Sequence, residues 1–108
     1  MAYRLVISRR ADEQLDSIIE YVAVRLNNPT AAAAILSDVE AIYCTLREMP
    51  ESMALCEDPY LASKEYHKAI LRKHNYVVLF KICEYEVRIA GIFHTLEDYT
   101  KEVKTNAE

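Results

Sequence analysis

Residues 66–99 read YHKAILRKHNYVVLFKICEYEVRIAGIFHTLEDY, and this stretch decides the fold of the chain. Together with residue 65 it contains three apolar runs, 65–72, 76–83 and 86–94, which are rich in β-branched and aromatic residues. Short polar breaks separate the runs, a pattern typical of a meander of three strands. All three histidines of the chain lie within it.

The positive charge of the chain also gathers in the meander. The whole chain has a formal net charge of -4 at pH 7, but within residues 60–94 basic side chains outnumber acidic ones by two to one. The basic residues of this region are Lys64, Lys68, Arg72, Lys73, Lys81 and Arg88. A surface that presents these strands can therefore hold an anion despite the acidic total.

Two amphipathic helices are predicted before the meander. Residues 3–7 are short and β-branched, which predicts a strand, and Ser8 is placed to cap the helix after it. Apolar residues then recur every three or four positions over 11–26 and again over 32–46, which is the spacing of a helix face. The Asn-Pro pair at 28–29 is expected to end the first helix and to cap the second.

The remaining segments complete a single α+β domain over residues 1–108. Residues 50–63 show no period and contain two prolines, so we expect a surface loop with a turn near residue 58. Residues 96–103 have a helix-like pattern, and Asp98 fits the first turn of that helix. The order predicts a helical hairpin packed on a small, mainly antiparallel sheet, with a short C-terminal helix.

Composition excludes several classes of protein. A single glycine leaves no Gly-rich loop for a dinucleotide or a nucleotide phosphate. The three cysteines are widely spaced, with no histidine at a ligand interval, which disfavours a disulfide framework and a zinc site. No apolar run is long enough for a signal peptide or a membrane span. We therefore expect a cytoplasmic protein with no cofactor, no metal and no membrane partner.

This order of elements, with YHK at 66–68, NYVVLF at 75–80 and IFHTLEDY at 92–99, resembles the RelE/ParE family of bacterial toxins. The resemblance covers roughly residues 3–103. It implies the toxin half of a toxin–antitoxin pair, held inactive by an antitoxin whose C-terminal segment wraps it. RelE-like members cleave messenger RNA in the ribosomal A site, whereas ParE-like members block DNA gyrase and catalyse nothing.

From the sequence we favour the nuclease interpretation, because the predicted sheet carries both cations and titratable groups. Its predicted site consists of His94, Arg72, Lys68, Arg88 and Tyr99. Cleavage without a metal needs a base for the 2′-hydroxyl, cations for the phosphate and a proton donor for the leaving oxygen. His94 or Tyr99 would move protons, and the three basic residues would bind the phosphate. Strict alternation places Arg88 and His94 on one face of the last strand, and Lys68 and Arg72 on one face of the first.

Each of these residues also has a structural interpretation. His94 suits a hydrogen-bonded strand end, Tyr99 suits a core plug at the end of the sheet, and Arg88 suits an ion pair with Glu86 or Glu84. Lys68 and Arg72 equally suit a solvated strand edge.

The acidic helices and the low pI favour a different function, that of a gyrase-binding toxin that docks through its hairpin and tail. A homologue that has lost activity and only binds its antitoxin is a third interpretation. For the antitoxin we expect a segment that folds on binding, with a helix over the apolar groove of the hairpin and carboxylates against the basic sheet.

Overall fold

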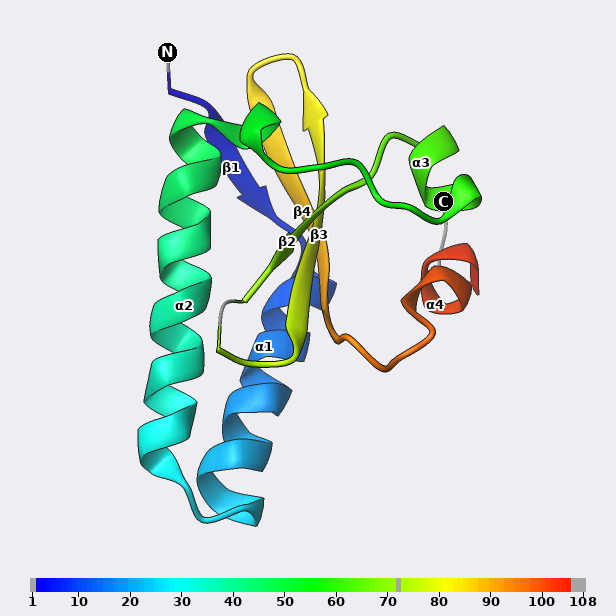
Figure 1. The fold of residues 1–108 in the computed structure, drawn as a ribbon. Helices are drawn as coiled ribbons and strands as arrows, with labels where there is room; N and C mark the ends of the chain where they lie inside the picture. The colour runs from blue at the N-terminus through cyan, green and yellow to red at the C-terminus, as the bar shows by residue number, and fades with distance from the viewer. Residues whose placement is uncertain (1, 72, 106–108) are drawn as a thin grey trace.

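The structure, a computed structural model, describes residues 2–71 and 73–105 and places a sheet between two layers of helices (Figure 1). The strands are β1 (Arg4–Ile7), β2 (His67–Ile70), β3 (Tyr76–Cys83) and β4 (Glu86–His94), in the order β1-β4-β3-β2. β1 runs parallel to β4, and the other neighbours are antiparallel. The predicted α+β class and three-stranded meander are confirmed, although β2 begins at His67 and ends at Ile70, within the predicted range 65–72.

The predicted helical hairpin consists of α1 (Arg9–Glu20) and α2 (Pro29–Glu48). Both predicted caps are present: the side chain of Ser8 accepts a hydrogen bond from a backbone N–H of α1 at 3.0 Å, and that of Asn28 accepts one from α2 at 3.1 Å. A main-chain N–H in the first turn of each helix therefore has a partner.

A π-helical turn, Tyr21–Arg25, continues α1. A wider turn changes the helical phase of the residues that follow it. Leu26, the last member of the predicted apolar stripe, is consequently exposed.

Two cores lie on opposite faces of the sheet. The hairpin packs on one face, and we call the buried cluster there the hairpin-side core. Its members are Ala11, Val22, Ala32, Ile35, Val39, Tyr43, Leu46, Ala69, Leu71, Val78, Phe80, Val87, Ile89 and Ile92. Burial raises the pKa of the Tyr43 hydroxyl to about 12.

The other face is covered by two short helices, α3 (Pro59–Ser63) and α4 (Tyr99–Thr105). The smaller cluster beneath them is called here the opposite core, and it contains Cys56, Leu61, Val77, Leu79, Phe93 and Val103. The two helices lie on the side of the sheet away from the hairpin (Figure 1). The sheet is therefore buried on both faces near the end of β4.

Both short helices begin at an aspartate. α3 interrupts the segment expected to be an irregular loop, and Asp58 accepts hydrogen bonds from the N–H groups of Tyr60 and Leu61 at 2.9 and 3.1 Å. α4 begins at Tyr99, three residues later than the predicted helical tail. Asp98 lies before its first turn, as predicted, and accepts from the N–H of Lys101 at 3.1 Å.

The alternation of β4 breaks at Ala90. Leu79 pairs with Gly91, whereas its neighbour Phe80 pairs with Ile89, so Ala90 is an extra residue on β4 and forms a β-bulge. Ile89 and Ile92, three residues apart, both belong to the hairpin-side core for this reason. The bulge exchanges the faces of all β4 residues that follow it.

The single glycine of the chain lies beside this bulge. A Cβ at Gly91 would lie 2.6 Å from the Phe93 ring and 2.9 Å from Oε1 of Gln14. The Gln14 side chain needs this space, because its Oε1 accepts the N–H of Ile92 at 2.8 Å on the edge of β4 that β1 leaves free beyond Ile89. Gly91 therefore permits α1 and β4 to approach closely.

Candidate functional site

Three cations lie together on the face of the sheet away from the hairpin. Lys68 pairs with Leu79 across β2 and β3, and Lys81 pairs with Arg88 across β3 and β4. Residues opposite each other in an antiparallel ladder point to the same side, and Leu79 belongs to the opposite core. Lys68, Lys81 and Arg88 are therefore neighbours on one surface, which we call the cationic face.

Each cation of this face has a partner already. Nε of Arg88 donates to Glu86 at 3.0 Å, and this hydrogen bond raises the pKa of Arg88. Nζ of Lys68 lies 3.7 Å from a Glu57 oxygen. Lys81 lies over the ring of Tyr66, with Nζ 4.5 Å from the ring centroid. Because surface pairs of this kind are weak, an incoming anion or carboxylate can replace the acidic partners.

His94 lies on the other face. The bulge turns it to the same side as Ile92, which belongs to the hairpin-side core, and its ring meets that of Tyr76 edge-on at 5.3 Å between centroids. Arg88 precedes the bulge, so it faces away from the hairpin. The prediction that Arg88 and His94 share a face is wrong, because one inserted residue reverses the alternation between them.

His94 also has the hydrogen bonds of a structural residue. Its Nδ1 accepts the N–H of Leu96 at 3.1 Å, and its own N–H donates to Glu97 at 2.8 Å. These bonds hold the turn that leads from β4 to α4. Along the sheet it lies roughly 17 Å from Arg88, since their partners Tyr76 and Lys81 are five residues apart on β3 and each extended residue advances the chain by about 3.3 Å.

The other two predicted site residues also lie apart from a common centre. The Tyr99 ring stacks on Phe93, with centroids 5.7 Å apart, and packs against the opposite core as a plug. Arg72 lies outside the described residues. Of the predicted set, the structure thus brings together Lys68 and Arg88. It adds Lys81, which was not among the predicted site residues. Lys81 could have been predicted, because the short turn between the two strands places it opposite Arg88.

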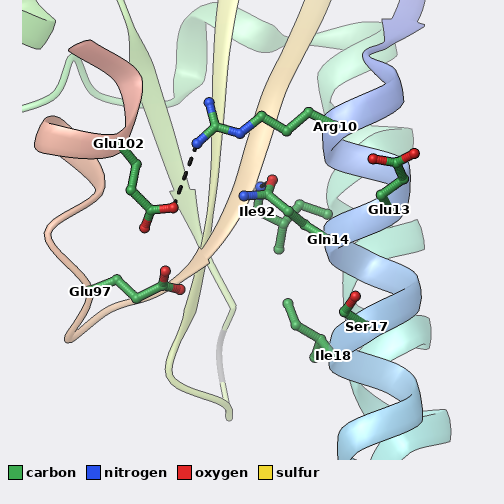
Figure 2. Close-up of a pocket in the computed structure, with 8 residues that line it drawn as sticks. All are labelled: Arg10, Glu13, Gln14, Ser17, Ile18, Ile92, Glu97 and Glu102. Atoms are coloured by element: carbon green, nitrogen blue, oxygen red, sulfur yellow. Dashed lines mark hydrogen bonds and ion pairs between the residues drawn. The ribbon is translucent and has the colours of Figure 1, made fainter. Parts of the chain in front are cut away.

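A pocket of about 360 Å³ lies elsewhere, between α1, β4 and α4 (Figure 2). Its walls are formed by Arg10, Glu13, Gln14, Ser17, Ile18, Ile92, Glu97 and Glu102. Of the predicted site residues that the structure describes, namely Lys68, Arg88, His94 and Tyr99, none lines it. The residues that line the pocket lie near opposite ends of the sequence, so no local sequence pattern predicts it.

Two further properties constrain the chemistry. Over residues 2–71 and 73–105, no cluster of three or more histidine, cysteine, aspartate or glutamate side chains is arranged to hold a metal ion. In the same part of the chain, no helix has both the length and the apolar character needed to cross a membrane.

Comparison with protein families identifies the fold. The model of the ParE toxin of type II toxin–antitoxin systems, parDE, matches residues 5–99, which include the hairpin and nearly the whole sheet. The chain belongs to the ParE toxin family. It is therefore the toxin component of a type II toxin–antitoxin system, as the order of elements predicted.

Solved structures share the fold of this ParE-family toxin. The chromosomal ParDE system of P. aeruginosa gives a TM-score of 0.70 at 21% identity, covering 86% of this chain and 96% of that chain. The RelBE2 toxin–antitoxin complex of Mycobacterium tuberculosis gives 0.59 at 21% identity, covering 87% and 99%. A search of curated proteins found no match. Both ParE-like and RelE-like relatives have this architecture, so the fold alone leaves the target open.

Proposed function

We propose that this ParE-family toxin arrests growth by binding DNA gyrase and does not cleave RNA. One observation carries the proposal: His94 lies on the opposite face of the sheet from Lys68 and Arg88. Transfer of a proton at a reacting phosphate requires the acid or base within hydrogen-bond reach of the same few atoms that the cations hold. A group on the far face of the sheet does not meet this requirement.

The family supports the choice of gyrase, because the matching model is that of the ParE toxins and ParE-like members act on gyrase without catalysis. In this proposal the toxin acts in the cytoplasm and an antitoxin holds it inactive. Carboxylates of that antitoxin are expected on the cationic face, where they would replace Glu57 and Glu86 as partners of Lys68 and Arg88.

Ribosome-dependent cleavage of messenger RNA is a second candidate, and the cationic face favours it. Lys68, Lys81 and Arg88 lie on one surface, and the aromatic ring of Tyr66 lies beside Lys81. A phosphate backbone is held by cations in this way, and a base stacks on such a ring. In this candidate the proton transfer falls to a residue other than His94.

Pulse labelling after induction of the toxin separates the two candidates. Gyrase inhibition predicts that thymidine incorporation fails before amino-acid incorporation and that a DNA-damage response follows. The variant His94→Ala should arrest growth as strongly as the unaltered chain, and so should the matched variant His74→Ala. Amino-acid incorporation that fails first, together with relief by His94→Ala but not by His74→Ala at equal folded yield, would contradict the proposal.

A further inference from the structure

The pocket between α1 and α4 is part of a longer groove. A second pocket of about 350 Å³ is lined by Ser17, Glu20, Tyr21, Val24 and Arg25, and Ser17 lines both. The two pockets therefore follow one side of α1 and of the π-helical turn after it. From residue 10 to residue 25 this side is about 22 Å long, at 1.5 Å per residue. We call it the α1 groove.

The α1 groove combines an apolar floor with an acidic rim. Ile18 and Ile92 line the first pocket, and the side chains of Tyr21 and Val24, 50% and 69% exposed, line the second. Figure 2 shows Ile18 on α1 and Ile92 on β4 between the two walls. Exposed apolar side chains beside a groove of this length are typical of a surface that a partner covers.

The rim carries more negative than positive charge. Its acids are Glu13 and Glu20 on the helical wall and Glu97 and Glu102 on the opposite wall, against the two cations Arg10 and Arg25. Arg10 reaches across the groove to Glu102 at 3.7 Å (Figure 2). The pKa of Glu102 is nevertheless raised. The largest cause is a hydrogen bond with Glu97, and the next are burial and the negative charge of Glu97. Glu13 pairs with Arg9 at 3.3 Å, and because exposed ion pairs of this kind are weak, basic side chains of a partner can replace the arginines.

We infer that the α1 groove binds a segment of the antitoxin in which apolar side chains alternate with lysine or arginine. The apolar side chains would cover Ile18, Ile92 and Val24, and the basic ones would meet the glutamates of the rim. This surface is separate from the cationic face, which lies on the side of the sheet away from the hairpin and calls for the opposite charge. The inference rests on the chain being the toxin of a toxin–antitoxin pair, and it holds whichever target the toxin has.

Charge reversal on the helical wall tests this. The double variant Glu13→Lys, Glu20→Lys changes two exposed positions of α1 that line the groove, and lysine is a good helix former there. The matched control, Asp16→Lys with Glu40→Lys, makes the same charge change at exposed helical positions outside the groove lining. The probe is the antitoxin encoded beside the toxin gene, and its affinity is measured by calorimetry for each full-length toxin.

We expect the groove variant to bind the antitoxin roughly tenfold more weakly or worse, whereas the control stays within about twofold. Val24→Ser should weaken binding severalfold, and Leu36→Ser, at a partly exposed position on α2, should not. All variants should keep the far-UV circular dichroism spectrum and the unfolding midpoint of the unaltered toxin, which shows that they are folded and separates this result from any failure of the gyrase proposal. Hydrogen exchange over residues 10–25 should slow on antitoxin binding.

Two results would overturn the inference. The first is equal antitoxin affinity for the groove variant and its control, with unchanged exchange over residues 10–25. The second is a groove variant that alters the sedimentation of the free toxin but not its antitoxin affinity, because the groove would then join two copies of this chain.

Discussion

The two faces of the sheet differ in how they are covered, and the difference separates stability from binding. Two long helices bury the hairpin side along most of the sheet, with members such as Leu46, Phe80 and Val87 fully buried. The opposite side has two short helices at one end and charged side chains at the other. The hairpin side therefore stabilises the fold, and the charged side chains of the opposite side can replace their present partners by those of another molecule.

The same difference explains why His94 and Tyr99 do not lie beside Lys68, Lys81 and Arg88 on the opposite side. The bulge at Ala90 places His94 on the hairpin side, and the ring of Tyr99 packs against the opposite core. What remains beside Lys68, Lys81 and Arg88 is a surface of positive charge without the predicted proton-transfer groups. In our proposal this surface recognises a partner.

The largest expected effect is on the hairpin-side core. Leu46→Ala should lower the free energy of unfolding by about 2–5 kcal/mol, because it removes a fully buried side chain between α2 and the sheet. Val103→Ala in α4 should cost roughly 1–2 kcal/mol, since fewer methyl groups are lost. Urea denaturation gives both values. An equal or larger loss for Val103→Ala would break the comparison between the faces.

Gly91→Ala is expected to cost about 1–3 kcal/mol, because its Cβ would overlap the Phe93 ring and Oε1 of Gln14. The size of this loss in unfolding free energy should depend on whether Gln14 is present. In the variant Gln14→Ala the same glycine substitution should cost less, and a double-mutant cycle in urea measures the difference. Additive losses would mean that Gln14 is not the limiting contact.

Much of this fold can be predicted from the sequence, for local reasons. The caps Ser8, Asn28 and Asp98, and the limits of β3 and β4, follow from side chains that act on their own neighbours. α3 was predicted only as a turn, although the Asp-Pro pair at its start carries the signal. The π-helical turn and the bulge were not predicted, because nothing in the local pattern marks the one residue that each inserts.

The candidate site was less predictable because its geometry depends on that bulge. Assigning faces by strict alternation is correct up to Ala90 and reversed from Gly91 onward. Lys68 and Arg88 were correctly placed on the first and third strands of the meander, on either side of β3, since pairing in a meander follows from its turns. The α1 groove could not be predicted from local sequence, because Glu13 and Glu97 line one pocket only when the chain after β4 folds back beside α1.

A smaller effect is expected from the cations themselves. Arg88→Ala and Lys81→Ala should leave the unfolding midpoint almost unchanged, because the ion pair of Arg88 is exposed to water and the contact of Lys81 with Tyr66 is only half-buried. Antitoxin affinity should fall for both, and more steeply at low salt. Thermal unfolding and binding at two salt concentrations check this. A clear loss of stability with unchanged binding would reverse the roles assigned to the two faces.

The smallest expected effect is a pH dependence at α4. The hydrogen bond with Glu97 raises the pKa of Glu102 above 4.5, so the folded state holds this proton more tightly than the unfolded state. The resulting stability is present below the ordinary carboxyl pKa and is lost as pH rises through the raised value. Carboxyl NMR titration should show Glu102 above 4.5 and Glu51, whose pKa the Tyr3 hydroxyl lowers, below it. Glu97→Gln should change the Glu102 titration and leave that of Glu51 unaltered.

The central claim is that this toxin acts by binding, and purified components test it most directly. The folded toxin is added in parallel to a DNA gyrase supercoiling reaction and to ribosomes programmed with a messenger RNA. We predict that supercoiling stops at stoichiometric toxin while the messenger stays intact. Cleaved messenger in the A site, with supercoiling unaffected, would contradict the claim.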